Sequence, residues 1–522
     1  MSNNCFSTLN GYEVKDAYAR QKNAENAQAI ADMIPTLEQM MSSGGKVPFT
    51  VYPEQYGAVG DGVHDDVEAI NAALAENLSV SLLPGKTYAI NGASGVIIPE
   101  NGNLYGNGAT IKVIPNNLQI YTGVYMGGSN SRMENVNLVG ERTHHTGEGG
   151  EWGHGLSIGG NADGVVVRDC KISDFWGDGI YLNLCSNVLI ENVVVDNSRR
   201  NGISVISVKN FKCLDSIFSN TNGTNPQSGI GIEANYDTDV LENVEFIRCR
   251  SINSASGTGI YSTVRKHGCS VVYRDCETDK AFAFTAITGT GCSFVAENCK
   301  FGGTVYLSSN EGANEFNFRN CYIKGSSGLP IVNTLFTAQT DRTLFDNCIF
   351  DGSAGSGNLI RQERGYLSNF SIKRSVIKDA TLGRPVLYWG DRDNGANNHI
   401  EVHMENSTFG EPNIPMWYGL INTCSAKVTG QVREAYQLTG LYCRDNVVKS
   451  YPSGGPAVTF VNGMPGDFHT LTNQCGRGDI WFAWDREMFI NGASVGTQYK
   501  IPNGATLIFY YTEHGTLHGW LA

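Results

Sequence analysis

The sequence between residues 148 and 233 is rich in side chains that can carry out acid–base chemistry. Asp178 lies between two glycines in WGDGIYL (176–182), Glu151 and His154 lie in EWGHGLSI, and Glu233 ends SGIGIE (228–233). Cleavage of a glycosidic bond requires two carboxyl groups about 5 to 9.5 Å apart, one as proton donor and one as nucleophile or base. The candidate catalytic residues are therefore Asp178, Glu233, Glu151 and His154.

Aromatic and basic side chains accompany these acids and can bind a sugar by stacking or by charge pairing. The candidate substrate-binding residues are Trp176, Tyr181, Arg199, Arg200 and Tyr261. The same set also fits a second reaction. Elimination or epimerisation of a uronic acid needs a cation that neutralises the carboxylate and a base that removes the C5 proton. The two arginines, His154 and Tyr181 are the candidates for those roles.

A short repeat can bring these distant segments together. Cys249, Cys276, Cys299, Cys321 and Cys348 follow one another at spacings of 27, 23, 22 and 27 residues. Each belongs to one pattern, apolar–polar–Asp/Asn–small–any–apolar, as in YRDCET and FRNCYI, and Cys170, Val193 and Ser216 fill the same place earlier. Such alternation predicts a half-buried strand, and a period in the twenties predicts a solenoid.

A second pattern follows each repeat: GHGLSI, GDGIYL, RNGISV, SGIGIE and GTGIYS. Short strands joined by Gly, Asn and Asp turns predict a parallel β-helix, whose turns stack about 4.8 Å apart. Residues of equal phase then form ladders. The cysteines should form a buried ladder and the Asx residues a ladder of turns: Asp169, Asn192, Asp215, Asp275, Asn298, Asn320 and Asn347. One further phase should hold His154, Asp178, Asn201, Ser228 and Thr258.

These patterns predict an all-β protein in three parts. Residues 1–48 form an N-terminal helical attachment segment, with a helix over 13–34. Residues 49–449 form the parallel β-helix, which YGAVGDGVHDDVEAINAAL (56–74) caps with a short helix. Residues 450–522, with alternating strands and clustered aromatics, form an antiparallel β-sandwich for trimerisation or carbohydrate binding.

Composition excludes several classes of function. The net charge of −13 and pI near 5.3 argue against non-specific binding to nucleic acid or anionic membranes. No apolar run of about 18 residues occurs, and the N-terminus lacks the apolar core of a signal peptide. The 14 cysteines include no CxxC pair. We predict no metal and no other cofactor.

The cap motif, followed by LLPGKTYAI (82–90) and the repeats, resembles the pectate-lyase-like superfamily of right-handed parallel β-helices. Within it, the likeness is greatest to bacteriophage tailspikes and capsule depolymerases and covers about residues 50 to 430. The superfamily includes lyases, hydrolases, epimerases and non-catalytic proteins, so the fold does not select the reaction. GHGLSIGG (153–160) resembles a polygalacturonase motif, but the family's paired aspartates and Arg-x-Lys are missing, so no catalytic residue is transferred.

The resemblance implies a tailspike-type depolymerase that hydrolyses a bacterial surface polysaccharide. Two alternatives remain open: a lyase or C5-epimerase acting on a uronate polymer, and an appendage that binds glycan without cleaving it. The expected location is a virion tail or the extracellular space, without a signal peptide. The N-terminal segment is the expected point of docking to a phage tail.

We predict that the protein is a homotrimer, because an exposed solenoid face needs covering and both ends of the chain read as association modules. Light scattering at micromolar concentration checks this. A monomer of 56.6 kDa would contradict it.

Overall fold

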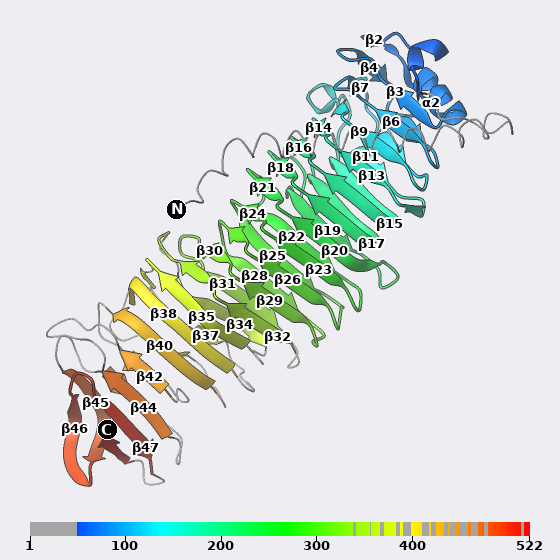
Figure 1. Cartoon of the computed structure of the whole chain (residues 1–522). Coiled ribbons are helices and arrows are strands. Elements are labelled where there is room, and N and C mark those ends of the chain that lie inside the picture. The colour runs from blue at the N-terminus through cyan, green and yellow to red at the C-terminus, as the bar shows by residue number, and fades with distance from the viewer. Residues whose placement is uncertain are drawn as a thin grey trace, which may run out of the picture.

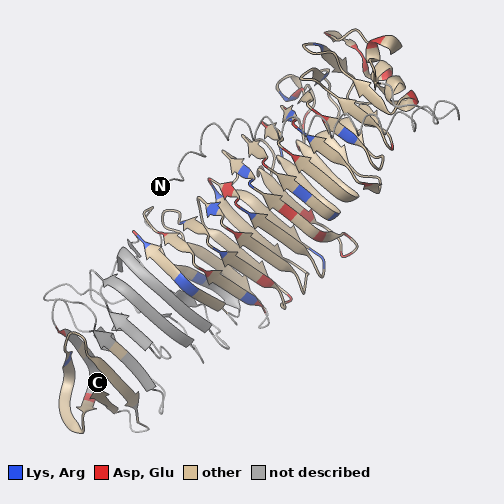
Figure 2. Cartoon of the chain, viewed as in Figure 1, with Lys and Arg blue, Asp and Glu red and all other residues tan. Residues whose placement is uncertain are grey.

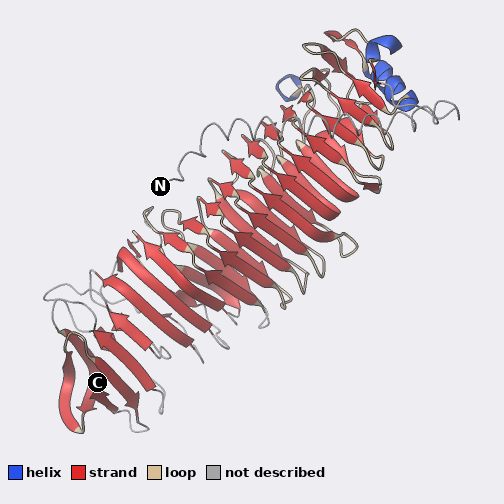
Figure 3. Ribbon diagram, in the orientation of Figure 1, coloured by secondary structure: helices blue, strands red, loops and turns tan. Residues whose placement is uncertain are grey.

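The computed structural model describes residues 50–337 without a break and, with gaps, residues 341–522. The predicted N-terminal helix over 13–34 lies outside the described residues. Figure 1 shows an elongated solenoid of about 13 turns that runs from α2 at one end to a separate sheet near the C-terminus. Strands joined by loops make up nearly all of the described chain (Figure 3). The predicted all-β solenoid is confirmed.

Strands of successive turns pair in parallel and form three columns. The first column contains β5 (Val96–Ile98), β8 (Ile120–Met126), β11 (Trp152–Ile158), the starts of β15 (Ile180–Glu191) and β17 (Ile203–Leu214), β19 (Ile230–Ala234), β22 (Thr258–Val264), β25 (Ala281–Ala286), β28 (Val305–Ser309), β31 (Val332–Phe336), β34 (Ile360–Gly365), β37 (Leu387–Trp389) and β39 (Trp417–Tyr418).

The second column contains β1 (Thr50–Val51), β3 (Ser79–Ser81), β6 (Asn103–Tyr105), β9 (Arg132–Glu134), β12 (Ala162–Asp163), β13 (Val166–Arg168), the ends of β15 and β17, β20 (Leu241–Ile247), β23 (Ser270–Arg274), β26 (Ser293–Glu297), β29 (Glu315–Arg319), β32 (Arg342–Asp346), β35 (Phe370–Lys378), β38 (Asn398–Phe409) and β40 (Cys424–Val432). The third contains β2 (Asp61–Asp65), β4 (Thr87–Ile90), β7 (Thr110–Val113), β10 (Asn137–Val139), β14 (Lys171–Ser173), β16 (Val194–Asp196), β18 (Ile217–Ser219), β21 (Arg250–Ile252), β24 (Glu277–Thr278), β27 (Lys300–Phe301), β30 (Tyr322–Lys324), β33 (Ile349–Asp351) and the ends of β35 and β38. The short strand β36 (Thr381–Leu382) pairs with the last residues of β38.

The helix α2 (Val67–Glu76) closes the N-terminal end of the solenoid, as the cap motif predicts. It buries Val67, Ile70 and Leu74 against the first turns. The buried carboxylate of Asp66 accepts hydrogen bonds from the backbone N–H groups of Val59 (2.7 Å) and Gly60 (3.0 Å), which fixes the glycine-rich turn before the helix. Among the described residues, no helix is both long enough and apolar enough to cross a membrane.

The Asp/Asn ladder marks turns, as predicted. All seven of its members adopt a left-handed backbone with φ between 52° and 56°. This conformation costs Asn and Asp less than other residues with a side chain. Neighbouring members also bond along the axis, as Asn192 Nδ2 donates to Asp169 Oδ1 at 2.6 Å and Asn347 Nδ2 to Asn320 Oδ1 at 2.8 Å.

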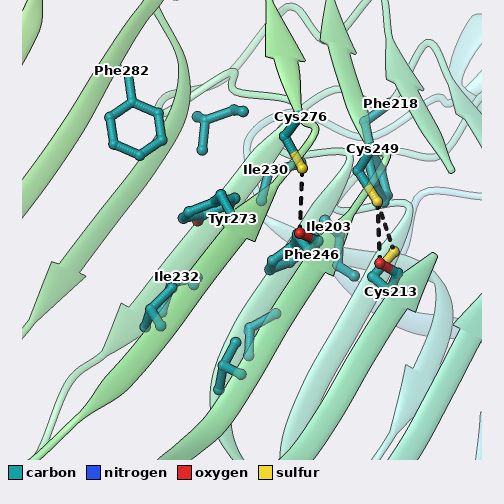
Figure 4. Packing of buried hydrophobic residues seen from close by; sticks show 14 of the residues in the cluster. Ile203, Cys213, Phe218, Ile230, Ile232, Phe246, Cys249, Tyr273, Cys276 and Phe282 are labelled. Carbon is teal, nitrogen blue, oxygen red and sulfur yellow. Dashed lines mark hydrogen bonds between the residues drawn. The ribbon is translucent and has the colours of Figure 1, made fainter. Parts of the chain in front are cut away.

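Inside the solenoid, identical places in successive turns stack into continuous apolar ladders. Phe211, Phe246 and Tyr273 follow one another at ring distances of 5.4 and 5.3 Å, close to the spacing of about 4.8 Å between turns. The cysteines lie beside them (Figure 4), and the thiol of Cys276 donates to the carbonyl of Phe246 in the preceding turn. Lys, Arg, Asp and Glu are interspersed along the outside of the solenoid (Figure 2).

The C-terminal sheet contains β41 (Gln437–Leu438), β42 (Asp445–Val448), β43 (Val458–Phe460), β44 (Phe468–Asn473), β45 (Ile480–Ile490), β46 (Ala493–Ile501), β47 (Thr506–Tyr511) and β48 (Leu517–Leu521). Its antiparallel pairs are β44–β47, β45–β46 and β47–β48. The sheet starts with β41, before the boundary predicted at residue 450. Its other pairs, β41–β43, β42–β44, β43–β45 and β45–β48, are parallel, so parallel pairing gives way to antiparallel pairing within this sheet.

We predict that the ladder cysteines are unreactive in the native protein and titrate as free thiols once it is unfolded. The ten described cysteines are unpaired and buried, and burial raises the pKa of the Cys170 and Cys185 thiols to about 12. A thiol assay with and without denaturant, in the absence of reductant, checks this. A count near zero in denaturant would contradict it.

Candidate active site

Arg200 lies at the centre of a charged cluster. Its Nη1 is 3.1 and 3.2 Å from the carboxylate oxygens of Asp178, and its Nη2 is 3.0 and 3.2 Å from those of Glu233. Its Nε is 3.4 Å from an oxygen of Glu151. Arg200 and the three acids belong to four successive turns, just before β11, β15 and β17 and within β19. One guanidinium therefore holds three carboxylates from different turns.

The register of the first column explains how these residues meet. Leu156, Ile180, Ile203, Ile230 and Ile260 pair successively from β11 to β22. Each lies two residues after a member of the ladder predicted to begin at His154 and Asp178. That predicted phase is confirmed. A ladder in strict register brings Asp178 directly beside its neighbours in the turns before and after it.

Asp178 is completely buried beneath Arg200. Besides the arginine, it accepts a hydrogen bond from the backbone N–H of Asn201 at 2.9 Å. Burial raises the pKa of Asp178, and the charge of Arg200 and the Asn201 N–H oppose part of that rise. With no exposed surface, this carboxylate is placed to hold Arg200 and not to contact a polymer.

His154 is a buried, neutral imidazole. Its Nδ1 accepts the backbone N–H of Asp178 at 3.2 Å, which leaves the ring proton on Nε2. Its ring stacks on that of Tyr181 with centroids 4.6 Å apart. Burial, followed by the charge of Arg200, lowers the pKa of His154 to about 3. Nε2 is buried and has no hydrogen-bond partner among the described residues, so it is available as a donor.

These groups line a cavity of about 60 Å³, called here the first cavity. It is lined by Glu151, Trp152, His154, Asp178, Tyr181, Arg200, Ile206, Glu233 and Asn235. The Glu151 side chain is 51% exposed and that of Glu233 is 19% exposed, whereas that of Asp178 is 0% exposed. All four predicted catalytic residues gather here, but only these two glutamates are open to a ligand.

Trp176 and Arg199 do not line the first cavity, contrary to the expectation that they bind sugar there. His145 stacks on the Trp176 ring at 4.0 Å, and the Arg199 guanidinium lies 4.1 Å from the same ring centre. Two groups this close must cover opposite faces, so no face is left for a sugar. Arg199 also donates to the Gly150 carbonyl at 2.6 Å, which ties it to the loop before β11.

Trp152 takes the place that Trp176 was expected to fill. It is 51% exposed and lies edge-on to His154 and Tyr181, at centroid distances of 6.0 and 6.2 Å. Its neighbour Glu151 was already a candidate, so its position in EWGH was the available signal. Ile206 and Asn235 carried no comparable signal.

A second cavity of about 460 Å³ adjoins the first, and Glu233 and Asn235 line both. The predicted binding residue Tyr261 lies in its wall, nearly buried, and its hydroxyl oxygen accepts a hydrogen bond from Asn201 Nδ2 at 3.0 Å. Burial, and then the charge of Glu233, raise the pKa of Tyr261 well above its usual value. Glu233 therefore lies at the junction of two adjoining cavities.

A family model described as a right handed beta helix region matches residues 90–272 and 154–339 of this chain. The chain is a right-handed parallel β-helix. The β-helix is 31% identical over 229 residues to the protein YclG of Bacillus subtilis strain 168, a match that covers 37% of this chain. The match spans 39% of the length of that relative.

Solved structures share the same fold at low sequence identity. The A-module of mannuronan C-5 epimerase AlgE4 from Azotobacter vinelandii is 16% identical, with a TM-score of 0.52, and the match covers 67% of this chain and 100% of that chain. Gene product 12 of bacteriophage phi29 is 15% identical, with a TM-score of 0.49, over 84% of this chain and 69% of that one. At such identities the likeness concerns the fold alone.

We predict that His154 makes the β-helix less stable in mild acid. Its pKa is about 3 in the folded protein and about 6.5 in the unfolded chain, so the unfolded state binds the extra proton between these values. The stabilisation from a neutral His154 is complete above about pH 6.5 and is lost as the pH falls towards about 3.

His154→Gln removes this titration. Its free energy of unfolding should fall less steeply with acid than that of the wild type, by at most about 1.4 kcal/mol per pH unit. Urea denaturation measures this at about pH 7, above both pKa values, and at about pH 6 and 5, between them. The exposed His267→Gln is the matched control and should follow the wild type. Parallel curves for His154→Gln and wild type would refute the assignment.

Proposed function

We propose that the protein is a glycoside hydrolase that cleaves a bacterial surface polysaccharide, with Glu233 and Glu151 as its catalytic carboxyl groups. The observation that carries this proposal is the arrangement around Arg200. Two accessible glutamates are bound to one guanidinium, and a buried aspartate holds the guanidinium from behind. Both glutamates line the first cavity beside an exposed tryptophan.

Their shared partner Arg200 sets an upper limit on the separation of the two glutamates. Each has an oxygen within 3.4 Å of a nitrogen of the same planar guanidinium. Those oxygens therefore cannot lie more than about 9 Å apart, within the upper limit for paired catalytic carboxyls. The ring of Trp152 supplies an apolar face for a sugar next to them.

The contacts differ between the two glutamates. Glu233 makes two hydrogen bonds to Arg200, which fix its position. Glu151 makes a single, longer contact of 3.4 Å and is more exposed. In the proposed reaction, one of the two is the proton donor and the other the nucleophile or base. His154 is buried and stacks on Tyr181, so it supports the wall of the first cavity. Asp178 is a positioning residue that holds Arg200.

Uronate elimination or epimerisation is less well supported in the first cavity. Both reactions need a cation that is free to neutralise the sugar carboxylate. The Arg200 guanidinium is already bound to three carboxylates. Both reactions also need a base, but burial raises the pKa of Tyr181 to about 12 and that of Tyr261 well above its usual value. Because both phenols are protonated and Arg200 is already bound to carboxylates, the first cavity favours hydrolysis over elimination or epimerisation.

We infer that the protein is a depolymerase of the tailspike type. The resemblance of the cap and repeats to phage depolymerases, and the right-handed β-helix fold, support an extracellular or virion-borne protein acting on a glycan. The predicted homotrimer and N-terminal docking to a phage tail belong to the same proposal. The fold by itself is shared by several reactions.

Glu233→Gln should lower turnover by at least about a hundredfold, because it removes the charge of a catalytic carboxyl while keeping its shape. The assay is release of reducing ends from a panel of purified bacterial capsular and secreted polysaccharides. Glu242→Gln is the matched control. That glutamate is 51% exposed on β20 and pairs with Lys209 at 3.1 Å, away from both cavities. It should keep full activity.

Two results would overturn the proposal. One is full activity in both Glu233→Gln and Glu151→Gln. The other is a polysaccharide that the wild type binds and never cleaves, which would make the protein a glycan-binding appendage. Asp178→Asn tests the positioning role separately, because loss of its charge should lower turnover at unchanged folding and leave glycan binding nearly intact.

A further inference from the structure

The two cavities differ in the cation that each offers to a ligand. In the first cavity, three carboxylates surround Arg200, and His154 is neutral, so the site carries net negative charge. In the second cavity the wall includes Arg265, which is exposed. Within the described residues, no acidic side chain lies within 4.0 Å of its guanidinium nitrogens and no side-chain hydrogen bond engages it. An anionic group is repelled from the first cavity and attracted to the second.

The position of Arg265 is fixed by the strand register. Its backbone N–H donates to the Ala234 carbonyl at 2.9 Å, which continues the pairing of β22 with β19 past the end of β22. Side chains alternate along a strand, so Arg265 lies on the same side as Tyr261 and Thr263, which line the second cavity with it. The register also places Arg265 beside Asn235, a residue of both cavities.

The acids nearest in sequence to this wall are engaged by backbone amides. Asp239 accepts the N–H groups of Asn235 and Tyr236 at 2.7 and 3.0 Å. Asp237 accepts the N–H of His267 at 3.1 Å. Glu233 is bound to Arg200. None of these three acids forms an ion pair with Arg265.

The remaining wall suits a sugar. Its volume of about 460 Å³ lies within the range of about 300–1,000 Å³ usual for small-molecule sites. Besides Tyr261, four aliphatic hydroxyl side chains and one amide line it, and such groups can exchange hydrogen bonds with sugar hydroxyls. They are Ser228, Ser256, Thr258, Thr263 and Asn235.

We propose that the second cavity binds a sugar that bears a carboxylate, and that Arg265 pairs with this carboxylate next to the bond cleaved at Glu233. The inference rests on the proposed hydrolase function and specifies its substrate as an acidic heteropolysaccharide. The acidic unit lies in the second cavity, and an uncharged unit faces Glu151, Glu233 and Trp152 in the first. Arg265 is thus a specificity-determining residue, and it belongs to a different turn from the reacting carboxyls.

Saturation-transfer NMR on the full chain tests this binding with defined probes. Methyl β-D-glucuronide should bind with measurable affinity, and methyl β-D-glucoside, which lacks the carboxylate, should bind at least about tenfold more weakly. Arg265→Gln should weaken the glucuronide about tenfold and leave the glucoside unchanged. The methyl glycoside of N-acetylneuraminic acid is run in parallel. Either acidic probe supports the site, and the tighter one identifies which kind of sugar supplies the carboxylate.

Arg250→Gln is the matched control, because Arg250 is a half-exposed arginine of β21 that pairs with Glu277 outside both cavities. It should bind glucuronide like the wild type. The proposal would be overturned if neither acidic probe bound more tightly than the glucoside, or if binding of the tighter acidic probe were unaffected by Arg265→Gln. Glu151→Gln separates this result from the hydrolase function, because Glu151 lines only the first cavity: it should lower cleavage sharply and keep glucuronide binding. A protein that binds glucuronide through Arg265 but cleaves nothing would keep the site and refute the hydrolase.

Discussion

Backbone hydrogen bonds between successive turns determine which side chains meet in this molecule. Each strand pairs in parallel with the strand one turn earlier and one turn later, so residues in equal phase lie about 4.8 Å apart. In the core this constraint stacks Phe on Phe and Cys on Cys. At the turns it stacks Asp and Asn in the left-handed conformation. On the outer wall of the first column it places an arginine among acids from its neighbours. The backbone of the site is therefore the same as in the other turns, and the site differs from them only in its side chains.

The Arg200 cluster is held together because a buried charge needs a partner. Asp178 has no exposed surface, and an unpaired carboxylate there would carry a desolvation cost of several kcal/mol, roughly. The hydrogen bonds from Arg200 and the Asn201 N–H offset this desolvation. In turn, Asp178 fixes the plane of the guanidinium. The outer edge of the same guanidinium then orients Glu233 and Glu151 without burying them. A buried acid thus prepares the geometry of two accessible ones.

The repeat period was sufficient to predict the solenoid, its turn ladder, its cysteine ladder and the phase that joins His154 to Asp178. Parallel pairing leaves little freedom once the period is known. The burial of Asp178 was not predictable, because it depends on Arg200 folding back over the preceding turn. The sequence also predicted Trp176, and not Trp152, as the tryptophan of the first cavity, for a similar reason. The segment before β11 does not repeat, and its His145 covers one face of Trp176. Arg265 was overlooked because nothing in its sequence context reveals that it lacks a partner.

The proposed hydrolase activity depends on the two accessible glutamates and on Arg200, which is bound to three carboxylates. Mass spectrometry of the oligosaccharides released from a cleaved polysaccharide tests it most directly. Hydrolysis adds one water to each bond broken, so every product should have the mass of intact repeat units plus one water. Products that lack this water and end in an unsaturated uronic acid would contradict the proposed hydrolase, because they are the products of elimination.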